Sequence, residues 1–140
     1  MKTSYLEEIL IKWRHDFHSC PELNFDVTKT SKKITSLLES SNIEVHSNIG
    51  RTGLVAIIKK GNSKRSIGIR ADMDALPVNE VNTFDYRSKH DGKMHACGHD
   101  GHVTMALGAA KHLAEKEDFD GIAYFVFQPD EEQTQGAQAM

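Results

Sequence analysis

The stretch Met94-His95-Ala96-Cys97-Gly98-His99-Asp100-Gly101-His102 decides how this chain is interpreted. It brings three histidines, one cysteine and one aspartate together in nine residues, and its two glycines let the backbone bend. Cys97 and His99 stand two positions apart, so in an extended loop their side chains leave the same side and can converge on one cation. Imidazole and thiolate are ligands that zinc and its neighbours favour. The stretch therefore predicts a metal site directly before a helix.

A structural role competes with this interpretation. A Cys-x-His pair alone is as compatible with an ordinary loop as with a pair of ligands. His102 also fits a solvent-facing position on the first turn of the helix that follows. The metal site therefore depends on acidic partners elsewhere in the chain.

The composition indicates a single globular domain. The chain has 140 residues, of which 39% are apolar and 26% charged, as in ordinary soluble proteins. The formal net charge of -3 gives no electrostatic reason to expect nucleic acid or an anionic membrane as a partner. No apolar run approaches the roughly 18 residues of a membrane span, and Met1–Leu6 lacks the apolar core of a signal peptide. Cys20 and Cys97 are too few cysteines for a disulfide framework, so we expect a cytoplasmic protein.

The first predicted helix has apolar residues at helical spacing, a capping box at Ser4 and Glu7 and a stop at Pro21. His18 and Glu22 lie at its polar end, where ordinary hydrogen bonds explain them better than a function does. The next segment predicts a second helix from about residue 27 to residue 41.

The second helix carries a buried apolar stripe, with Asp26 or Thr28 as its cap. Asn42 should stop it, because asparagine tolerates the left-handed backbone conformation. Ile43 and Val45 then alternate as in a short strand. We therefore expect a helix followed by an edge of the sheet.

Three further strands are predicted. The runs Leu54–Lys59 and Arg65–Ala71 are rich in branched apolar residues and are joined by a short turn, which predicts an antiparallel hairpin. The run Gly121–Phe127 shows no polar alternation, so both of its faces should be covered. Between the last two of these strands, residues 78–93 predict an irregular loop and residues 103–117 predict a helix. In this helix, Gly108 and several alanines form a thin face for close approach to a sheet.

Two pairs of carboxylates follow predicted strands, Asp72 with Asp74 and Glu131 with Glu132. Strand ends are common positions for active-site residues in α/β folds. The pair Asp72 and Asp74 alone is equally compatible with a capped turn, and a pair such as Glu131 and Glu132 is usually only a solvated surface. The buried strand and the proline before Glu131 favour a fixed position, and one rim of the sheet can then hold both pairs beside the cysteine–histidine stretch.

Several segments together resemble the M20 metallopeptidase family, and most closely its amidohydrolase branch of hippurate hydrolases, auxin-conjugate hydrolases and N-acetyl-diaminopimelate deacetylases. The match runs in the family's order through essentially the whole chain. Its most specific parts are the runs at residues 70–77 and 94–102. The segments that carry it are Asp16-Phe17-His18, Pro21-Glu22-Leu23, Gly68 to Pro77, Met94 to His102, and Phe127-Gln128-Pro129 with Glu131 and Glu132.

The resemblance implies an α/β fold, a three-layer-type sheet with helices packed on it, in the N-terminal part of a zinc-peptidase-like catalytic domain. Residues 1–140 are then expected to be a partial, metal-binding catalytic domain. The lid or dimerisation domain and the C-terminal half of the catalytic domain would be absent. A homo-oligomer stays compatible with the sequence, although the domain that usually dimerises would be missing.

The resemblance also implies a site with two divalent metals. By motif position, the metal ligands are Cys97, His99 and Glu132. The catalytic residues are Glu131, as the general base, and Asp74, which is expected to orient a ligand.

Further acidic positions lie near this implied site. Asp72 matches one of them, and Asp100 is expected to orient a ligand as Asp74 does. Zinc is the first expectation because a thiolate favours softer metals, with manganese, cobalt and nickel as alternatives.

The implied activity is hydrolysis of the amide bond of N-acyl amino acids or short peptides by a metal-activated water. The chain of 140 residues is expected to hydrolyse them poorly or not at all, because ligands of the complete site would be missing. Two alternatives are a non-catalytic remnant that binds metal and a module that pairs with a complementary polypeptide.

Overall fold

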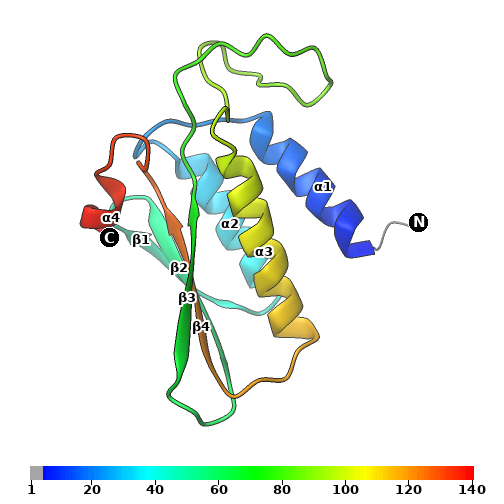
Figure 1. Ribbon diagram of the computed structural model, residues 1–140, viewed down its shortest axis with the longest axis vertical. Helices are drawn as coiled ribbons and strands as arrows, with labels where there is room; N and C mark the ends of the chain where they lie inside the picture. The colour runs from blue at the N-terminus through cyan, green and yellow to red at the C-terminus, as the bar shows by residue number, and fades with distance from the viewer. Residues whose placement is uncertain (1–4) are drawn as a thin grey trace.

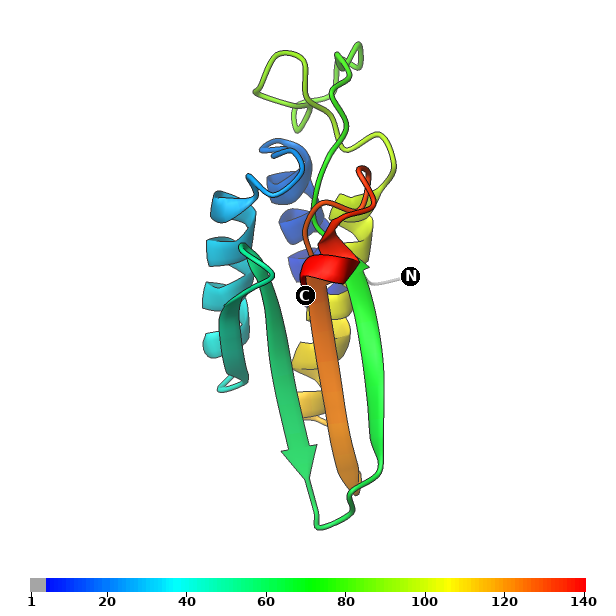
Figure 2. The ribbon, with the colours of Figure 1, turned by 90° about the vertical axis from the view of Figure 1, so that its left-hand side faces the viewer.

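The computed structural model describes residues 5–140, in which four strands form one mixed sheet. The elements in chain order are α1 (Tyr5–His18), α2 (Thr28–Glu39), β1 (Glu44–Ile49), β2 (Gly53–Lys60), β3 (Ser66–Asp72), α3 (His99–Glu115), β4 (Gly121–Gln128) and α4 (Gly136–Ala139). Figures 1 and 2 show α1, α2 and α3 on the same side of the sheet, with the short α4 near one end on the other side. The predicted α/β class, with helices packed on a sheet, is confirmed.

Two other predictions concern the N-terminal capping box and the expected absence of a membrane span. The capping box predicted at Ser4 involves a residue outside the described range, so it stays a prediction. Among residues 5–140, no helix combines the length and the apolar character needed to cross a membrane.

The hairpin predicted between residues 54–59 and 65–71 is wrong. These strands are β2 and β3, and β4 lies between them, antiparallel to β2 and parallel to β3. The connection can span this gap because two strand spacings amount to about 9.6 Å and each extended residue covers about 3.3 Å. The central position suits β4 because Phe125 and Phe127 are completely buried there. The parallel pairing brings the carboxyl ends of β3 and β4 to one edge of the sheet.

Only one face of β4 is buried, although its apolar sequence predicted cover on both faces. Phe125 and Phe127 are buried in the core together with side chains of the helices, whereas Ile122, Tyr124 and Val126 are partly exposed on the opposite face. The prediction is wrong within residues 5–140 because all three longer helices lie on the same face. The strand therefore keeps the period-two burial of a sheet with one covered face.

Gly108 on the thin face of α3 packs against α1, while α3 also contacts the sheet, mainly at β3. A Cβ atom added at Gly108 would lie 2.8 Å from Leu10 Cδ2, so glycine allows α1 to approach α3 closely. Val103 and Leu107 of α3 are almost completely buried in the same core. The close approach that glycine allows at Gly108 is therefore to α1.

At the start of α2, a backbone N–H group is hydrogen-bonded by a side chain from outside the helix. Val27 occupies the N-cap position without a side-chain hydrogen bond, so the predicted caps Asp26 and Thr28 are wrong. Instead, the Glu22 carboxylate accepts hydrogen bonds from the backbone N–H and the hydroxyl of Thr30 at 2.8 and 2.9 Å. A carboxylate at this end also complements the helix dipole. Beyond the other end of α2, Asn42 has the predicted left-handed conformation, with φ 56°.

The edge strand β3 should make the chain self-associate. Within residues 5–140 no strand pairs with its outer edge, and Ile67 on it is 61% exposed. Free edges with apolar side chains pair with other chains, and a lysine opposes this. We expect association that rises with concentration and that Ile67→Lys reduces, measured by sedimentation velocity. Ile11→Lys on α1, where the wild-type side chain is 47% exposed, is the matched control. An equal effect of both substitutions would contradict the edge-strand explanation.

Candidate metal centre

The carboxylate pairs and the cysteine–histidine stretch meet at one edge of the sheet. β3 and β4 both end there, and α3 begins there, at the upper end of the sheet in Figure 1. The intervening loop returns to this edge because Leu76 and Met94 exchange backbone hydrogen bonds of 3.0 Å in each direction. Gly98, at φ 90°, provides the left-handed turn that starts α3. The predicted common rim is therefore present.

His99 is held with one ring nitrogen free for a ligand bond. Its Nδ1 lies 2.8 Å from the backbone carbonyl oxygen of Asp74. A carbonyl oxygen only accepts, so Nδ1 carries the hydrogen and the lone pair of a neutral ring is on Nε2. Nε2 faces three carboxylates, with oxygens of Asp72, Glu131 and Glu132 at 3.8, 3.7 and 3.8 Å. The ring is 2% exposed, so this orientation is fixed by its surroundings.

The Asp74 carboxylate holds the backbone of Glu131 and Glu132 in place. Its completely buried carboxylate accepts the backbone N–H of Glu131 at 3.0 Å and that of Glu132 at 3.1 Å. Burial alone would raise the pKa of Asp74, but these bonds and the hydrogen bond with His99 lower it below its ordinary value. For His99, burial acts to lower the pKa, and the interactions with Asp74 and Asp72 outweigh it and raise the pKa. Asp74 is thus placed to position other side chains.

Cys97 completes a set of three donors. Its Sγ, a ring nitrogen of His99 and a carboxylate oxygen of Glu132 lie within 4.8 Å of one another. Ligands around tetrahedral zinc are about 3.3–3.7 Å apart, so binding needs a closure of at most roughly 1.5 Å. Oε1 of Glu132 is buried and has no hydrogen-bond partner in the described part of the chain, which fits a cation at this point. Partial loss of solvation and the hydrogen bond with Glu132 raise the pKa of Cys97, so a metal would displace a proton from the thiol.

Asp100 contacts α1 instead of orienting a ligand. Its Oδ2 lies 2.7 Å from His18 Nδ1 and 3.3 Å from Arg14 Nε. The other His18 nitrogen, Nε2, lies 3.0 Å from an oxygen of Glu80 in the 78–93 loop. The structure therefore does not support the predicted role of Asp100. Sequence reasoning missed Arg14 and Glu80, because neither stands in a motif or a periodic pattern.

His95 is buried among these groups without a partner. It is 5% exposed, and neither ring nitrogen has a hydrogen bond within residues 5–140. Burial, with smaller effects from neighbouring charges, lowers the pKa of His95 from 6.5 to about 4. The ring is therefore neutral at pH 7, and it is not among the donors of the Cys97, His99 and Glu132 set.

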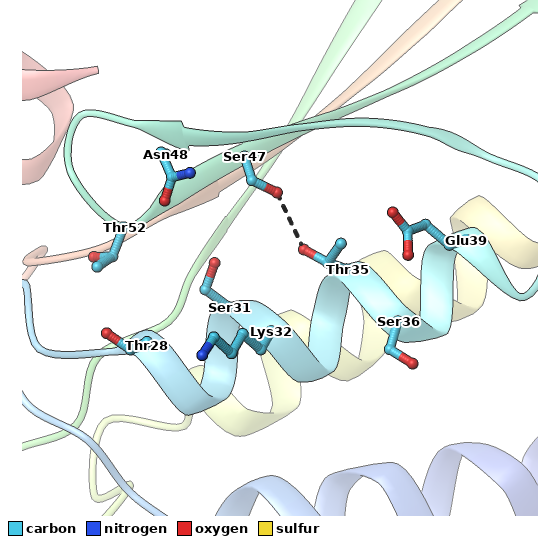
Figure 3. A pocket seen from close by; sticks show the side chains of 9 residues that line it. All are labelled: Thr28, Ser31, Lys32, Thr35, Ser36, Glu39, Ser47, Asn48 and Thr52. Atoms are coloured by element: carbon cyan, nitrogen blue, oxygen red, sulfur yellow. Dashed lines mark hydrogen bonds between the residues drawn. The ribbon is translucent and has the colours of Figure 1, made fainter.

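A separate hollow of about 290 Å³ lies between α2 and β1 (Figure 3). Its lining is mostly hydroxyl side chains, and a hydrogen bond of 3.3 Å joins Thr35 and Ser47. Lys32 and Glu39 are the charged residues of this lining. The lining contains no histidine or cysteine, so the candidate site lies at the rim and not in this hollow.

A mixed sheet whose rim carries cysteine, histidine and glutamate donors defines the chain as a candidate metal-binding α/β protein. Its sequence matches Peptidase family M20/M25/M40 over residues 68–140, and the chain belongs to that family.

Curated relatives and a solved structure agree with this assignment. The chain is 50% identical over 129 residues to a hippurate hydrolase of Campylobacter jejuni, covering 92% of this chain and 33% of the relative. It is 43% identical over 124 residues to an N-acyl-L-amino acid amidohydrolase of Geobacillus stearothermophilus, covering 88% and 34%. The YXEP protein of Bacillus subtilis, described as a dinuclear metal binding peptidase of the M20 family, superposes with a TM-score of 0.91 at 41% identity, covering 96% of this chain and 38% of that one. The chain thus spans about one third of these curated relatives.

Replacing Asp74 should destabilise the rim. In Asp74→Asn, an amide NH₂ replaces one carboxylate oxygen, so one of the two glutamate N–H groups loses its acceptor. We expect the free energy of unfolding to fall by about 1–3 kcal/mol, measured by urea denaturation with chelator present. The control is Asp85→Asn in the exposed loop, which should change it by less than about 0.5 kcal/mol. Equal values for the two variants would show that Asp74 does not hold the glutamates.

The buried His95 should make the native state sensitive to acid. Between pH 6.5 and about 4 the unfolded chain takes up a proton at His95 that the native chain does not, so stability falls as the pH falls. The separation of the two pKa values corresponds to about 3 kcal/mol. Urea denaturation at several pH values, with chelator, should show a weaker pH dependence for His95→Gln than for wild type. Parallel curves would contradict the prediction, because all other groups titrate in both proteins.

Proposed function

We propose that this chain carries the metal-binding part of an amidohydrolase that acts on N-acyl amino acids. The observation that carries the proposal is the His99 ring, whose free Nε2 faces Glu131 and Glu132 at 3.7 and 3.8 Å, with Cys97 in the same donor set. The names of the relatives from Campylobacter jejuni and Geobacillus stearothermophilus support the substrate class. Short peptides are further candidates, given the peptidase family.

The proposed ligands are Cys97, His99 and Glu132. Thiolate and imidazole favour zinc, with manganese, cobalt and nickel as alternatives. When bound, a pair of divalent cations supplies Lewis-acid activation of water and of the amide carbonyl. Asp74 keeps the His99 tautomer and the backbone of Glu132 in place through the hydrogen bonds described above.

Glu131 is the proposed general base. Its Oε2 lies 3.7 Å from Nε2 of the proposed ligand His99, and its backbone N–H donates to the Asp74 carboxylate. The carboxylate accepts a proton from water as the water oxygen bonds to the amide carbon. It then gives that proton to the nitrogen as the C–N bond breaks, so that a carboxylic acid and an amine leave.

We expect slow turnover by the 140-residue chain itself. The side chain of Glu131 is 37% exposed and Cys97 is exposed, so bulk water reaches the reacting groups. Water-filled sites weaken the electrostatic interactions on which such catalysis depends. The same exposure favours the alternative function, metal binding without turnover, and the experiment below separates the two.

Metal content and hydrolysis test the proposal separately. After loading with zinc and desalting, Cys97→Ala and His99→Ala should lose the metal that mass spectrometry finds in wild type. Cys20→Ala, which removes the other exposed cysteine, should retain it. Glu131→Gln should retain the metal and lose about 10²–10⁴-fold of any hydrolysis of hippurate or N-acetyl amino acids.

The outcomes have distinct meanings. Wild-type metal content in Cys97→Ala and His99→Ala would overturn the ligand assignment. Metal-loaded wild type without detectable hydrolysis, at any of the four metals, would favour the non-catalytic alternative. Equal turnover in Glu131→Gln and wild type would exclude Glu131 as the base.

A further inference from the structure

The buried His18 side chain joins three segments that are far apart in the sequence. His18 is the last residue of α1 and is 3% exposed. Its Nδ1 lies 2.7 Å from Oδ2 of Asp100 in the first turn of α3, and its Nε2 lies 3.0 Å from Oε1 of Glu80 in the 78–93 loop. These partners are 82 and 62 residues away along the chain. One imidazole ring therefore connects α1, α3 and the loop.

The two bonds fix the ring on both sides. Carboxylate oxygens only accept hydrogen bonds, so His18 meets both partners when both of its ring nitrogens carry hydrogen. Hydrogen bonds between charged groups are among the strongest in proteins. Partial loss of solvation acts to raise the pKa of Glu80, but its hydrogen bonds with Ser88, Asn82 and His18 lower the pKa below its ordinary value. The loop thus presents an ionised carboxylate to His18.

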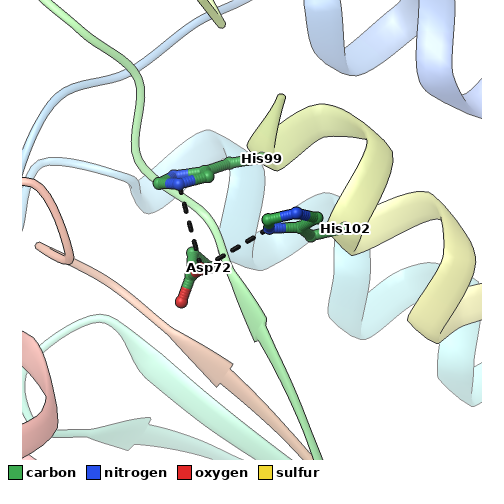
Figure 4. Close-up of side chains that lie close together, drawn as sticks. All are labelled: Asp72, His99 and His102. Atoms are coloured by element: carbon green, nitrogen blue, oxygen red, sulfur yellow. Dashed lines mark ion pairs between the residues drawn. The ribbon is translucent and has the colours of Figure 1, made fainter. Parts of the chain in front are cut away.

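Asp100 links His18 to the turn that carries His99. It directly follows His99 in the chain and is 1% exposed. Figure 4 shows the His99 ring beside Asp72, and its Nδ1 lies 2.8 Å from the backbone oxygen of Asp74. Neighbouring side chains of an α-helix point about 100° apart, so Asp100 leaves the turn in another direction, toward His18. The turn is therefore held from two directions, and loss of the bond to His18 would weaken one of them.

The 78–93 loop lies along the end of α1, and the carboxylate bond described above is one of several contacts there. The ring of Tyr86 stacks on that of His15, with centroids 3.6 Å apart. The backbone N–H of Lys89 donates to the carbonyl oxygen of Ser19 at 2.9 Å. From this loop the chain continues to Cys97. The direction from which the chain reaches Cys97 thus depends on how the loop lies on α1.

Gly98 makes the distance between the proposed donors depend on these contacts. It stands between Cys97 and His99 with φ 90°, and glycine has wide backbone freedom. The peptide itself therefore does not fix the distance between the thiol and the imidazole. The loop restrains the backbone before the glycine, Asp100 restrains the backbone after it, and both restraints meet at His18.

We propose that His18 is a positioning residue of the metal centre, which keeps the thiol and the imidazole on either side of Gly98 at binding distance. It acts through Asp100 and Glu80, the carboxylates that accept its two hydrogen bonds, and not through a bond to a proposed ligand. The inference rests on the proposed function, because it takes the ligands from there. Groups that orient metal ligands typically change metal affinity by about 10–100-fold when they are replaced.

Two amide substitutions separate the two bonds of His18. The amide nitrogen of asparagine can take the place of Nδ1, so His18→Asn keeps a donor for Asp100. The amide nitrogen of glutamine can take the place of Nε2, so His18→Gln keeps a donor for Glu80 and loses the link to the turn. We expect His18→Gln to lower the cobalt affinity of the chain at least about 10-fold, and His18→Asn to lower it less. Calorimetry measures the affinity, and the sulfur-to-cobalt charge-transfer band of the bound ion should be weaker at saturation in His18→Gln.

A merely structural role of His18 gives the opposite order. Asparagine is smaller than glutamine and leaves a larger cavity, so His18→Asn should be the less stable variant in urea with chelator present. Cobalt affinities that follow stability, with His18→Asn the weaker binder, would overturn the proposal, as would wild-type affinity in His18→Gln. The matched control is His112→Gln, whose wild-type ring lies 2.9 Å from a carboxylate oxygen of Glu117 and which should bind cobalt like wild type.

Failure of the proposed function looks different. Absence of bound cobalt in wild type would overturn the metal centre and this inference together, whereas an altered order among the variants overturns this inference alone. Circular dichroism checks the fold of each variant. If His18→Gln does not fold, Arg14→Gln removes the other contact of Asp100, 3.3 Å long, from a side chain that is 44% exposed. That variant should also bind cobalt more weakly, and an unchanged affinity would overturn the proposal.

Discussion

The hydrogen bonds of Asp74 are the constraint on which the rim depends. Its backbone carbonyl fixes the tautomer of His99, and its carboxylate holds the backbone N–H groups of Glu131 and Glu132. Asp74, two residues beyond the end of β3, thereby connects the start of α3 to the loop after β4. Because Asp74 is completely buried, these bonds do not compete with water, and the positions of the three partners are coupled.

This coupling is available only because β3 and β4 are parallel neighbours. Their pairing places Asp72 opposite Gln128, so the segments that follow β3 and β4 leave the sheet at the same edge. A β2–β3 hairpin, as the short connection suggested, would not by itself have brought the glutamates to the end of β3. Strand order therefore decides whether the acidic groups form a site or two unrelated turns.

The buried polar groups next to the rim serve the fold and the loop. His18 joins Asp100 in α3 to Glu80 in the long loop, and the neutral His95 packs close by, with its ring 6.4 Å from that of His18. The conspicuous nine-residue stretch thus divides its side chains between two tasks. Cys97 and His99 face the rim, whereas His95 and Asp100 face α1 and the loop.

Local patterns in the sequence determined much of this protein. Apolar periodicity predicted the helices and strands, Asn42 predicted the end of α2, and motif positions singled out Cys97, His99 and the glutamates. These features depend on residues close together in the chain, where spacing and backbone preference act directly. The family followed from the same motifs.

Tertiary structure alone decided the strand order, the one-sided burial of β4, the use of Glu22 as a remote cap and the contacts of Asp100. Each of these features depends on contacts between residues that are far apart in the sequence. The free energy of such contacts depends on which partners the packed core brings together. Capping residues and short hairpins are only local preferences. The burial of Phe125 and Phe127 in the centre of the sheet outweighed the hairpin, and the Glu22 carboxylate took the place of the predicted caps of α2. The sequence alone determined which donors the chain has, and only folding decided which of them meet at His99.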